Sequence, residues 1–484
     1  MTILNMVTKG SWWWANLEEP TDLAVSISWT TATITWTDPV TLRTIPPTSF
    51  SKSVLVRKVG SAPADPSDWT VVVEETVKDT YKTTWYEDTW LTKWTKYYYR
   101  VFSYSADGGI SYWDSAKTIR NYTYTVVWNE TSSPSQFFVR YEDDAAWLTQ
   151  WSTDFDEFFG YYGCRLASDW TESAKVEQSS PWVLDITQLW DLTAWDNVMI
   201  AFPVMWIKMS KSWSQVTLSI TNELDKSGYQ YYAHCTGSLS NPWTPKSVFY
   251  LWAYKVYNDW NNVLKSLSWK SPLTNQTMSV FCTRAKSNGS WYNIIWYYQR
   301  QFINALYMMK YCNPNSQSTI WAWRTSGSKA NTWWTNSQTS ATYWTSSTSQ
   351  QVKLFWLEDW WGNVRDWIWW AYTNSSNTLY TQLSWYSGAL SWWESTWSSL
   401  WITWYNYTMS SIVWNNKVLF WPNATIDNNY SSYYCDEVDV GGGSYLPRAS
   451  GSYNRWVASW AFTMEFDTSA TYKDADIGSR LLFL

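Results

Sequence analysis

The sequence predicts a mostly β protein in which a β-sandwich is followed by an α+β C-terminal domain. Residues 20–119 consist of short runs of alternating apolar and polar residues separated by turn clusters, a pattern typical of antiparallel strands. The later residues, 136–484, are rich in Ser, Thr, Asn, Tyr and Trp and contain one clear helical pattern. In Tyr298–Lys310 the apolar residues recur three or four positions apart, as on one face of a helix.

Two segments within residues 20–119 carry the clearest strand pattern. In Ala32–Trp36 and Tyr97–Val101, every second residue is apolar or aromatic and faces one side of the predicted strand. The run Leu91–Tyr97 resembles the tyrosine corner of fibronectin type III domains, with Trp94 where glycine is usual. This resemblance implies a fibronectin type III β-sandwich. Such domains usually serve as spacers, so we assign this one no chemistry.

The segments flanking the predicted sandwich have no strand pattern. Residues 1–19 show no reliable periodicity, and we expect them to form an N-terminal attachment segment. Residues 120–135 are polar and include Pro134, so we expect a linker there. The most apolar stretch, Val198–Ile207, is about half the ~20 residues that a membrane-spanning helix needs, so we expect one core strand and no membrane insertion.

The most specific motif lies at residues 352–370. With Trp356 and Trp369 read as glycine, it resembles the signature of the formylglycine-generating-enzyme type of C-type lectin fold. Residues 451–462 and 477–483 resemble the C-terminal segments of that family, and Phe202–Lys208 resembles its early core strand. The resemblance implies that residues 136–484 form a loop-rich C-type lectin-like domain. The polar members of the motif are expected to satisfy buried backbone groups: Glu358, Asp359, Asn363 and Asp366.

The subgroup that the sequence resembles most comprises phage tail and surface proteins, including targets of diversity-generating retroelements. That resemblance implies an adhesin that displays a ligand-binding face on the lectin scaffold. Because Thr463, Glu465 and Asp467 alternate with apolar residues, they are predicted to point together away from the core. An ordinary solvated strand face remains the alternative interpretation. Carried over by position, the binding face comprises Tyr453, Asn454, Arg455, Thr463, Glu465, Asp467, Tyr472 and Asp474.

The resemblance also implies partners and a location. We expect a host cell-surface protein or glycan as the ligand, other virion tail proteins as assembly partners, and a homotrimer by analogy with tail proteins. No secretory signal is visible at Met1–Met6, so we expect assembly in the host cytoplasm and a position on the virion tail. A structural tail or baseplate decoration protein without a host ligand is the alternative function.

Composition argues against several other classes. The chain has 35 Lys and Arg against 41 Asp and Glu, a net charge of −6, and no basic stripe, so we expect no nucleic-acid partner. The fold's namesake oxidises with a close cysteine pair, but Cys435 is the only cysteine after Cys312, so an oxidase or hydrolase is the least favoured reading. We expect no catalytic residue and no cofactor, and we assign no metal site. Calcium bound through Asp, Asn and carbonyl oxygens, as in many lectins, stays an alternative, although the spacing in Asp436–Asp439 is not diagnostic of it. His234-Cys235 is interpreted as a packed or surface pair rather than a partial metal site.

The 46 tryptophans stand against only 17 glycines, as if the two counts had been exchanged. Many lie in contexts typical of glycine turns, including Asp68-Trp69-Thr70, Asp169-Trp170-Thr171 and Asp259-Trp260-Asn261. Our hypothesis is that the gene reads UGA as glycine and that the printed sequence renders UGA as Trp. A Trp-rich carbohydrate binder is the alternative. The tryptophans that fit an apolar pattern, and so are read as genuine, are Trp36, Trp206, Trp360, Trp361 and Trp367.

Overall fold

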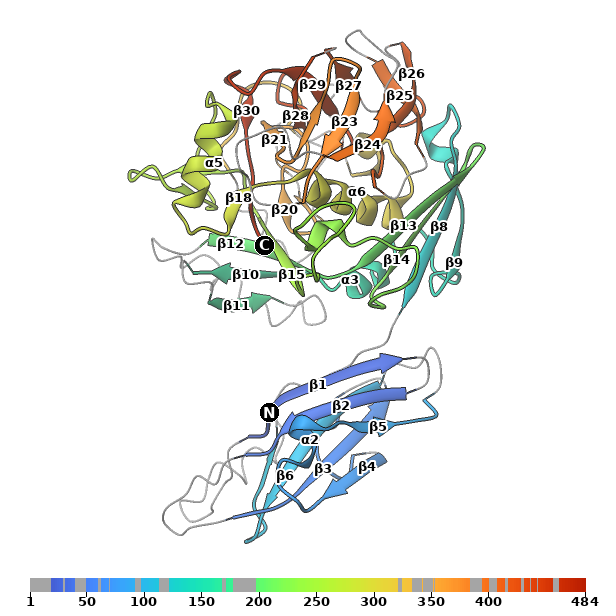
Figure 1. The fold of residues 1–484 in the computed structure, drawn as a ribbon, viewed down its shortest axis with the longest axis vertical. Helices are drawn as coiled ribbons and strands as arrows, with labels where there is room; N and C mark the ends of the chain where they lie inside the picture. The colour runs from blue at the N-terminus through green and yellow to red at the C-terminus, as the bar shows by residue number, and fades with distance from the viewer. Residues whose placement is uncertain are drawn as a thin grey trace. The chain divides into compact units, whose positions relative to one another are not determined.

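The chain is mostly β, as the sequence predicts, and contains several antiparallel sheets. It divides into two compact units, one up to Tyr122 and one from Thr123 onward (Figure 1). The computed structural model describes residues 19–28, 31–39, 49–59, 62–68, 70–91, 97–112, 122–167, 171–176, 197–320, 324–332, 342, 351, 353–383, 394–399, 407–413, 417–427, 431–435, 437–441, 443–455 and 461–484.

The first unit, blue in Figure 1, has two sheets with strand orders β1-β2-β5 and β4-β3-β6-β7. A single cluster of buried side chains draws on both sheets, and Ile34, Trp36 and Tyr99 lie within it. The Trp36 indole N–H donates to Asp38 Oδ1 over 2.9 Å. The described elements are β1 (Thr21–Ser28), β2 (Thr31–Thr37), β3 (Phe50–Val59), β4 (Thr70–Glu75), α2 (Thr80–Thr83), β5 (Tyr86–Asp88), β6 (Tyr97–Ser105) and β7 (Ile110–Tyr112).

A six-stranded sheet in the second unit has the order β11-β10-β12-β15-β31-β18. The strand β31 (Leu481–Phe483) pairs with both β15 and β18, so it joins β18 to the rest of this sheet. Helix α5 (Met278–Lys286) contributes Phe281 to the core beside it. The other strands are β10 (Tyr162–Leu166), β11 (Glu172–Val176), β12 (Asn197–Pro203), β15 (Val248–Trp252) and β18 (Tyr292–Ile294).

A four-stranded sheet has the order β13-β14-β8-β9, and it corrects the expected linker at residues 120–135. Strand β8 (Thr123–Asn129) pairs along its full length with β14 (Gln215–Thr221) and buries Val126 and Trp128. The strand is buried continuously from Tyr124 to Trp128 rather than on one face, so it does not show the alternation that identifies a half-buried strand. Pro134 lies buried at the start of a short 3-10 helix. The second unit therefore begins near Thr123 rather than at residue 136.

The stretch Val198–Ile207 forms two strands instead of the single core strand expected. Strand β12 ends at Pro203, and β13 (Trp206–Ser212) begins three residues later in a different sheet. Proline has no backbone N–H to donate to a strand partner, so the ladder ends there. The chain thereby passes from the six-stranded to the four-stranded sheet, whose last member is β9 (Phe138–Asp143).

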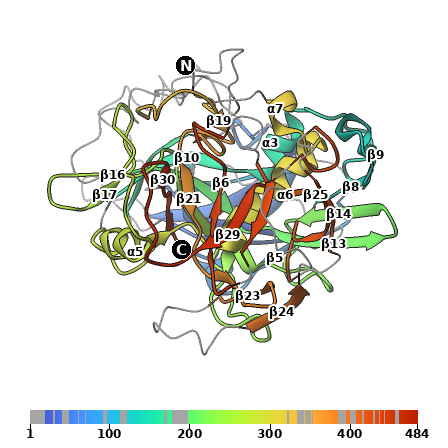
Figure 2. The ribbon, with the colours of Figure 1, turned by 90° about the horizontal axis from the view of Figure 1, so that it is seen from above.

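The expected helix is present as α6 (Tyr297–Tyr311), and it is buried on all sides rather than on one face. In Figure 2, α6 lies nearer the middle of the second unit than α5 does. Its polar side chains bond to the surrounding loops: Arg300 donates to the carbonyl oxygens of Trp360 (2.9 Å) and Ala461 (2.6 Å). Among the described helices, none is long and apolar enough to cross a membrane.

A seven-stranded sheet near the C-terminus has the order β26-β25-β27-β29-β28-β21-β30. Its strands are β21 (Arg365–Trp367), β25 (Tyr407–Ile412), β26 (Pro422–Asp427), β27 (Glu437–Val440), β28 (Leu446–Ala449), β29 (Met464–Thr468) and β30 (Ile477–Gly478). The smaller elements are α3 (Asp154–Phe159), β16 (Tyr257–Asn258), β17 (Leu264–Lys265), α7 (Ser316–Thr319), β19 (Lys353–Leu354), β20 (Leu357–Glu358), β22 (Ala371–Thr373), β23 (Thr378–Thr381) and β24 (Glu394–Ser399).

Candidate ligand-binding face

The motif at residues 353–370 forms a buried polar core that holds loops together. The Asn363 side chain donates to Ala330 O (3.1 Å) and to Asp359 Oδ2 (2.8 Å), and it accepts from Ala330 N–H (3.0 Å). Asp366 forms a fully buried ion pair with Lys255 at 2.7 Å. Asn363 therefore satisfies backbone groups as expected, whereas Asp359 and Asp366 mainly satisfy other side chains.

Strand β29 carries two of the expected site residues, Glu465 and Asp467, into the middle of the seven-stranded sheet. It runs parallel to β27 and antiparallel to β28. Because of this register, Glu465 lies opposite both Asp439 and Arg448. Figure 1 shows β27, β28 and β29 side by side in the C-terminal part of the second unit. Segments far apart in sequence thus contribute charged groups to one region of the sheet.

Glu465 is fully buried among arginines. Its Oε2 lies 2.6 Å from Arg365 and 2.7 Å from Arg448, with Arg455 at 3.9 Å. Arg365 also pairs with Asp476 at 2.9 Å. Burial alone would raise the pKa of Glu465, but the three arginines together lower it, so the carboxylate is held ionised.

The burial of Thr463 and Glu465 corrects part of the expected face. Both side chains are fully buried, so neither can contact a ligand directly. The alternation itself is present, because Phe466 packs against Trp421 on the core side, 5.3 Å between ring centres. The side that carries Glu465 is nevertheless covered, because Arg365, Arg448 and Arg455 converge on that carboxylate.

Six of the eight expected residues reach the surface around the buried ion pair between Arg365 and Glu465. We refer to these six residues as the C-terminal face. Tyr472 is 38% exposed; its hydroxyl donates to Asp474 Oδ2 (2.9 Å), and its ring lies 5.4 Å from the Arg448 guanidinium. Arg448 also pairs with Asp467. The C-terminal face comprises exposed Asn454 and Tyr472 and half-buried Tyr453, Arg455, Asp467 and Asp474.

Ser452 links the loop of the C-terminal face to the charges beneath it. Its hydroxyl lies 2.6 Å from Asn454 Oδ1 and 2.8 Å from Asp476 Oδ2. Burial, followed by the charges of Asp476 and Asp474, raises the pKa of Tyr453, which places that phenol near the same carboxylates. The C-terminal face therefore lies above the buried ion pairs of Arg365 with Glu465 and Asp476. The hydrogen bonds of Ser452 connect it to them. Residues 456–460, which complete the resemblance at 451–462, lie outside the described residues.

Glu437 and Asp439 on β27 are site residues that the sequence analysis did not assign to the face. Burial and the neighbouring carboxylates Glu465 and Asp467 raise the pKa of Glu437 to about 7 and that of Asp439 to about 8. Glu437 lies 3.4 Å from Arg455, whereas Asp439 Oδ1 has no hydrogen-bond partner among the described residues. The acidic run Asp436–Asp439 was visible in the sequence, but the position of Asp439 beside Glu465 depends on strand pairing across 26 residues.

The described part of the chain contains no group of three or more His, Cys, Asp or Glu side chains placed to hold a metal ion. His234 is fully buried and lies between Phe249 and Phe302, with ring centres 4.7 and 5.0 Å away. Burial lowers its pKa to about 3, so the imidazole is neutral. Burial also raises the pKa of Cys235 to about 12. Of the two arrangements that the sequence left open, packed or surface, the pair has the packed one.

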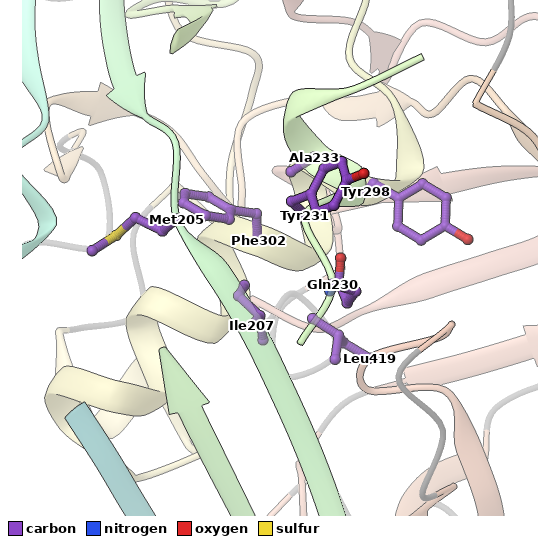
Figure 3. Close-up of a pocket in the computed structure, with 8 residues that line it drawn as sticks. All are labelled: Met205, Ile207, Gln230, Tyr231, Ala233, Tyr298, Phe302 and Leu419. Carbon is purple, nitrogen blue, oxygen red and sulfur yellow. The ribbon is translucent and has the colours of Figure 1, made fainter. Parts of the chain in front are cut away.

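A small, mostly apolar pocket lies in the second unit (Figure 3). Strand β13 contributes Ile207 and helix α6 contributes Tyr298 and Phe302 to its wall, and no carboxylate, histidine or cysteine lines it. It therefore lacks the converging acid and base groups that a hydrolytic site needs. The lining residues are Met205, Ile207, Gln230, Tyr231, Ala233, Tyr298, Phe302 and Leu419.

Comparison with models of known protein families finds no match to this chain, and comparison with curated proteins finds none either.

Proposed function

We propose that this protein is a phage tail-associated adhesin whose C-terminal face binds a protein or glycan on the host cell surface. One observation carries the proposal: six predicted binding residues gather at the surface around the buried pair Arg365–Glu465. A fixed base beneath mixed Tyr, Arg, Asn and Asp side chains suits recognition, because ordered groups lose little entropy on binding. Diversification by a retroelement is a further part of this proposal and rests on the sequence resemblance alone.

The charge of the site favours a ligand with basic groups. The region contains the carboxyl groups of Glu437, Asp439, Glu465, Asp467 and Asp476 and the guanidinium groups of Arg365, Arg448 and Arg455. Because the pKa of Glu437 is about 7 and that of Asp439 is about 8, a cation beside them would favour their ionised forms. Asp467 is partly exposed, and Asp439 has a carboxylate oxygen without a hydrogen-bond partner among the described residues. A cationic group docking there would gain charge-assisted contacts at the cost of modest desolvation.

The rest of the proposed organisation follows from the same resemblance. The first unit, with sheets β1-β2-β5 and β4-β3-β6-β7, would serve as a fibronectin type III spacer. We propose a position on the virion tail, assembly with other tail proteins as a homotrimer, and no catalytic activity, cofactor or nucleic-acid partner. The alternative, a structural decoration protein, requires the C-terminal face to be buried against another virion protein.

A cell-binding assay with two double variants tests the proposal. Arg455→Ala with Tyr472→Ala removes two partly exposed side chains of the face, each engaged with a charge: Arg455 with Glu437, Tyr472 with Arg448. Arg140→Ala with Tyr257→Ala is the matched control, because Arg140 pairs with Glu142, and Lys270 lies 5.4 Å from the Tyr257 ring.

The adhesin proposal predicts that the purified chain binds host cells, that the control binds equally, and that the face variant does not. If the wild-type chain does not bind host cells but binds tail proteins through this face, the result would support the alternative function, a structural decoration protein. Equal binding by the face variant and the wild type would refute the assigned face.

A further inference from the structure

Six tryptophans of the described residues have a left-handed backbone conformation. Without a Cβ, glycine adopts positive φ readily, whereas a bulky side chain there is an outlier. Asp and Asn are the residues ordinarily enriched at such positions, yet here the six Trp outnumber each of them taken singly, five Asp and four Asn. Those tryptophans are Trp90, Trp151, Trp213, Trp269, Trp356 and Trp370, with φ between 57° and 74°.

Trp213 lies in the two-residue turn between β13 and β14. Ser212 pairs with Gln215, so Trp213 and Ser214 form the loop. Trp213 has φ 57°, and Ser214 is not among the residues with positive φ. This is the pattern of a type II′ turn, whose first central position takes glycine. The Trp213 side chain is 94% exposed, so burial does not explain its presence.

Trp356 lies in the corresponding turn between β19 and β20. Leu354 pairs with Leu357, and both loop residues have positive φ, 49° for Phe355 and 65° for Trp356. These values define a type I′ turn, in which glycine is strongly favoured at the second position. The Trp356 indole N–H is buried without an acceptor among the described residues. The motif resemblance, an independent argument, reads this same position as glycine.

A second set of tryptophans has the opposite character. Their backbones are not in the left-handed region, they are buried, and each indole N–H donates a hydrogen bond. The four are Trp36 to Asp38 (2.9 Å), Trp128 to Tyr434 (3.1 Å), Trp360 to Asn304 (3.1 Å) and Trp367 to Gln276 (3.3 Å). A large aromatic side chain with an N–H donor is what these sites require.

We propose that the natural chain carries glycine, encoded by UGA, at the six positive-φ positions and tryptophan at Trp36, Trp128, Trp360 and Trp367. The geometry also refines the choice within the motif: Trp370 has positive φ, whereas Trp369 does not. Likewise, Asn262 rather than Trp260 takes the left-handed position of its turn.

The assignment bears on the ligand as well. Four of the six positions lie among the most exposed aromatic side chains of the described chain: Trp90, Trp151, Trp213 and Trp269. With glycine there, these sites provide no aromatic platform for sugar stacking. Other exposed tryptophans, among them Trp147 and Trp243, are not among the six positions, so the assignment removes four candidate stacking sites without assigning the ligand to one surface. This inference stands whether or not the C-terminal face binds a host ligand.

Codon reading and peptide mass spectrometry of the chain from its source test the proposal together. We expect UGA codons and glycine-containing peptides at the six positions, and UGG codons with tryptophan at the four. UGG codons at Trp213 and Trp356 would overturn the proposal. So would UGA codons at those positions that yield tryptophan in the peptides.

A thermal unfolding experiment tests the conformational argument on the chain as printed. Trp213→Gly removes an exposed side chain and relieves the positive φ, so we expect the Tm to rise by about 1–3 °C. Trp260→Gly is the matched control: Trp260 is 89% exposed without positive φ, so glycine should leave the Tm unchanged or lower it. If Trp213→Gly lowers the Tm as much as the control does, the conformational argument is wrong.

Discussion

Arg365 and Glu465 lie 100 residues apart in sequence and meet at 2.6 Å inside the second unit, with side chains 5% and 1% exposed. Arg365 comes from the motif at residues 352–370 and Glu465 from the expected binding segment. The pair therefore joins the buried core around that motif to the strand beneath the C-terminal face. Its burial makes it a structural base for that face rather than a ligand contact.

Breaking this pair should destabilise the second unit strongly. Glu465→Gln leaves Arg365 and Arg448 facing a neutral amide, and losing one member of a buried ion pair costs about 3–5 kcal/mol. Denaturant unfolding measures the loss. Glu142→Gln, which removes the exposed partner of Arg140, is the control and should cost no more than about 1 kcal/mol. Similar losses in both variants would show that Glu465 is not held as described.

Asp439 should make the protein less stable as the pH rises. Its pKa in the folded protein, about 8, lies above the ordinary value of an aspartate, 3.8, because burial and the carboxylates Asp467, Glu465 and Glu437 oppose ionisation. The stability that comes from protonated Asp439 is therefore complete below about pH 4 and is lost as the pH rises through about 8. Asp439→Asn should flatten that dependence and raise stability at pH 8. Unfolding free energies measured from pH 5 to 9 check both effects. A variant less stable than the wild type at pH 8 would contradict this account.

Asn363 should be hard to replace in the motif. The Asn363 side chain hydrogen-bonds to both the N–H and the carbonyl oxygen of Ala330. The backbone of Asn363 has φ 59°. Asn363→Ala loses these bonds and puts alanine, which tolerates the left-handed region less well than asparagine, at positive φ; together these changes should cost about 2–4 kcal/mol. Asn363→Gly loses the same bonds but tolerates the backbone conformation, so it should be less destabilising. Unfolding free energies that rank glycine below alanine would refute this explanation.

Local patterns in the sequence predicted the local structure well. The period of the apolar residues in Tyr298–Lys310 located helix α6 to within one residue at each end, and the alternation in Ala32–Trp36 falls within β2. The same approach failed at Thr123–Asn129, because polar flanking residues suggested a linker where β8 enters a sheet. This segment is a strand because it pairs with β14, about 90 residues later in the chain. No local sequence pattern indicates that pairing.

In the candidate site too, the sequence predicted some features correctly and missed those that depend on tertiary contacts. The sequence placed Tyr472 and Arg455 in the expected face, and both are partly exposed. It also placed Glu465 there, but that residue is buried, because Arg365 arrives from a strand 100 residues earlier. Asp439 became part of the site only through the parallel pairing of β27 with β29. Exposure and charge pairing across distant strands depend on tertiary contacts, which period-two alternation cannot supply.

The dissociation constant for host cells, compared between the wild type and Arg455→Ala with Tyr472→Ala, tests the central claim most directly. Hot-spot residues of this kind typically contribute about 2 kcal/mol or more each, so the double variant should bind roughly a thousandfold more weakly. Its unfolding free energy is measured beside it, because Arg455 also pairs with the buried Glu437 and Glu465. The control, Arg140→Ala with Tyr257→Ala, should match the wild type. Equal dissociation constants for all three proteins would contradict the proposal that the C-terminal face binds the host.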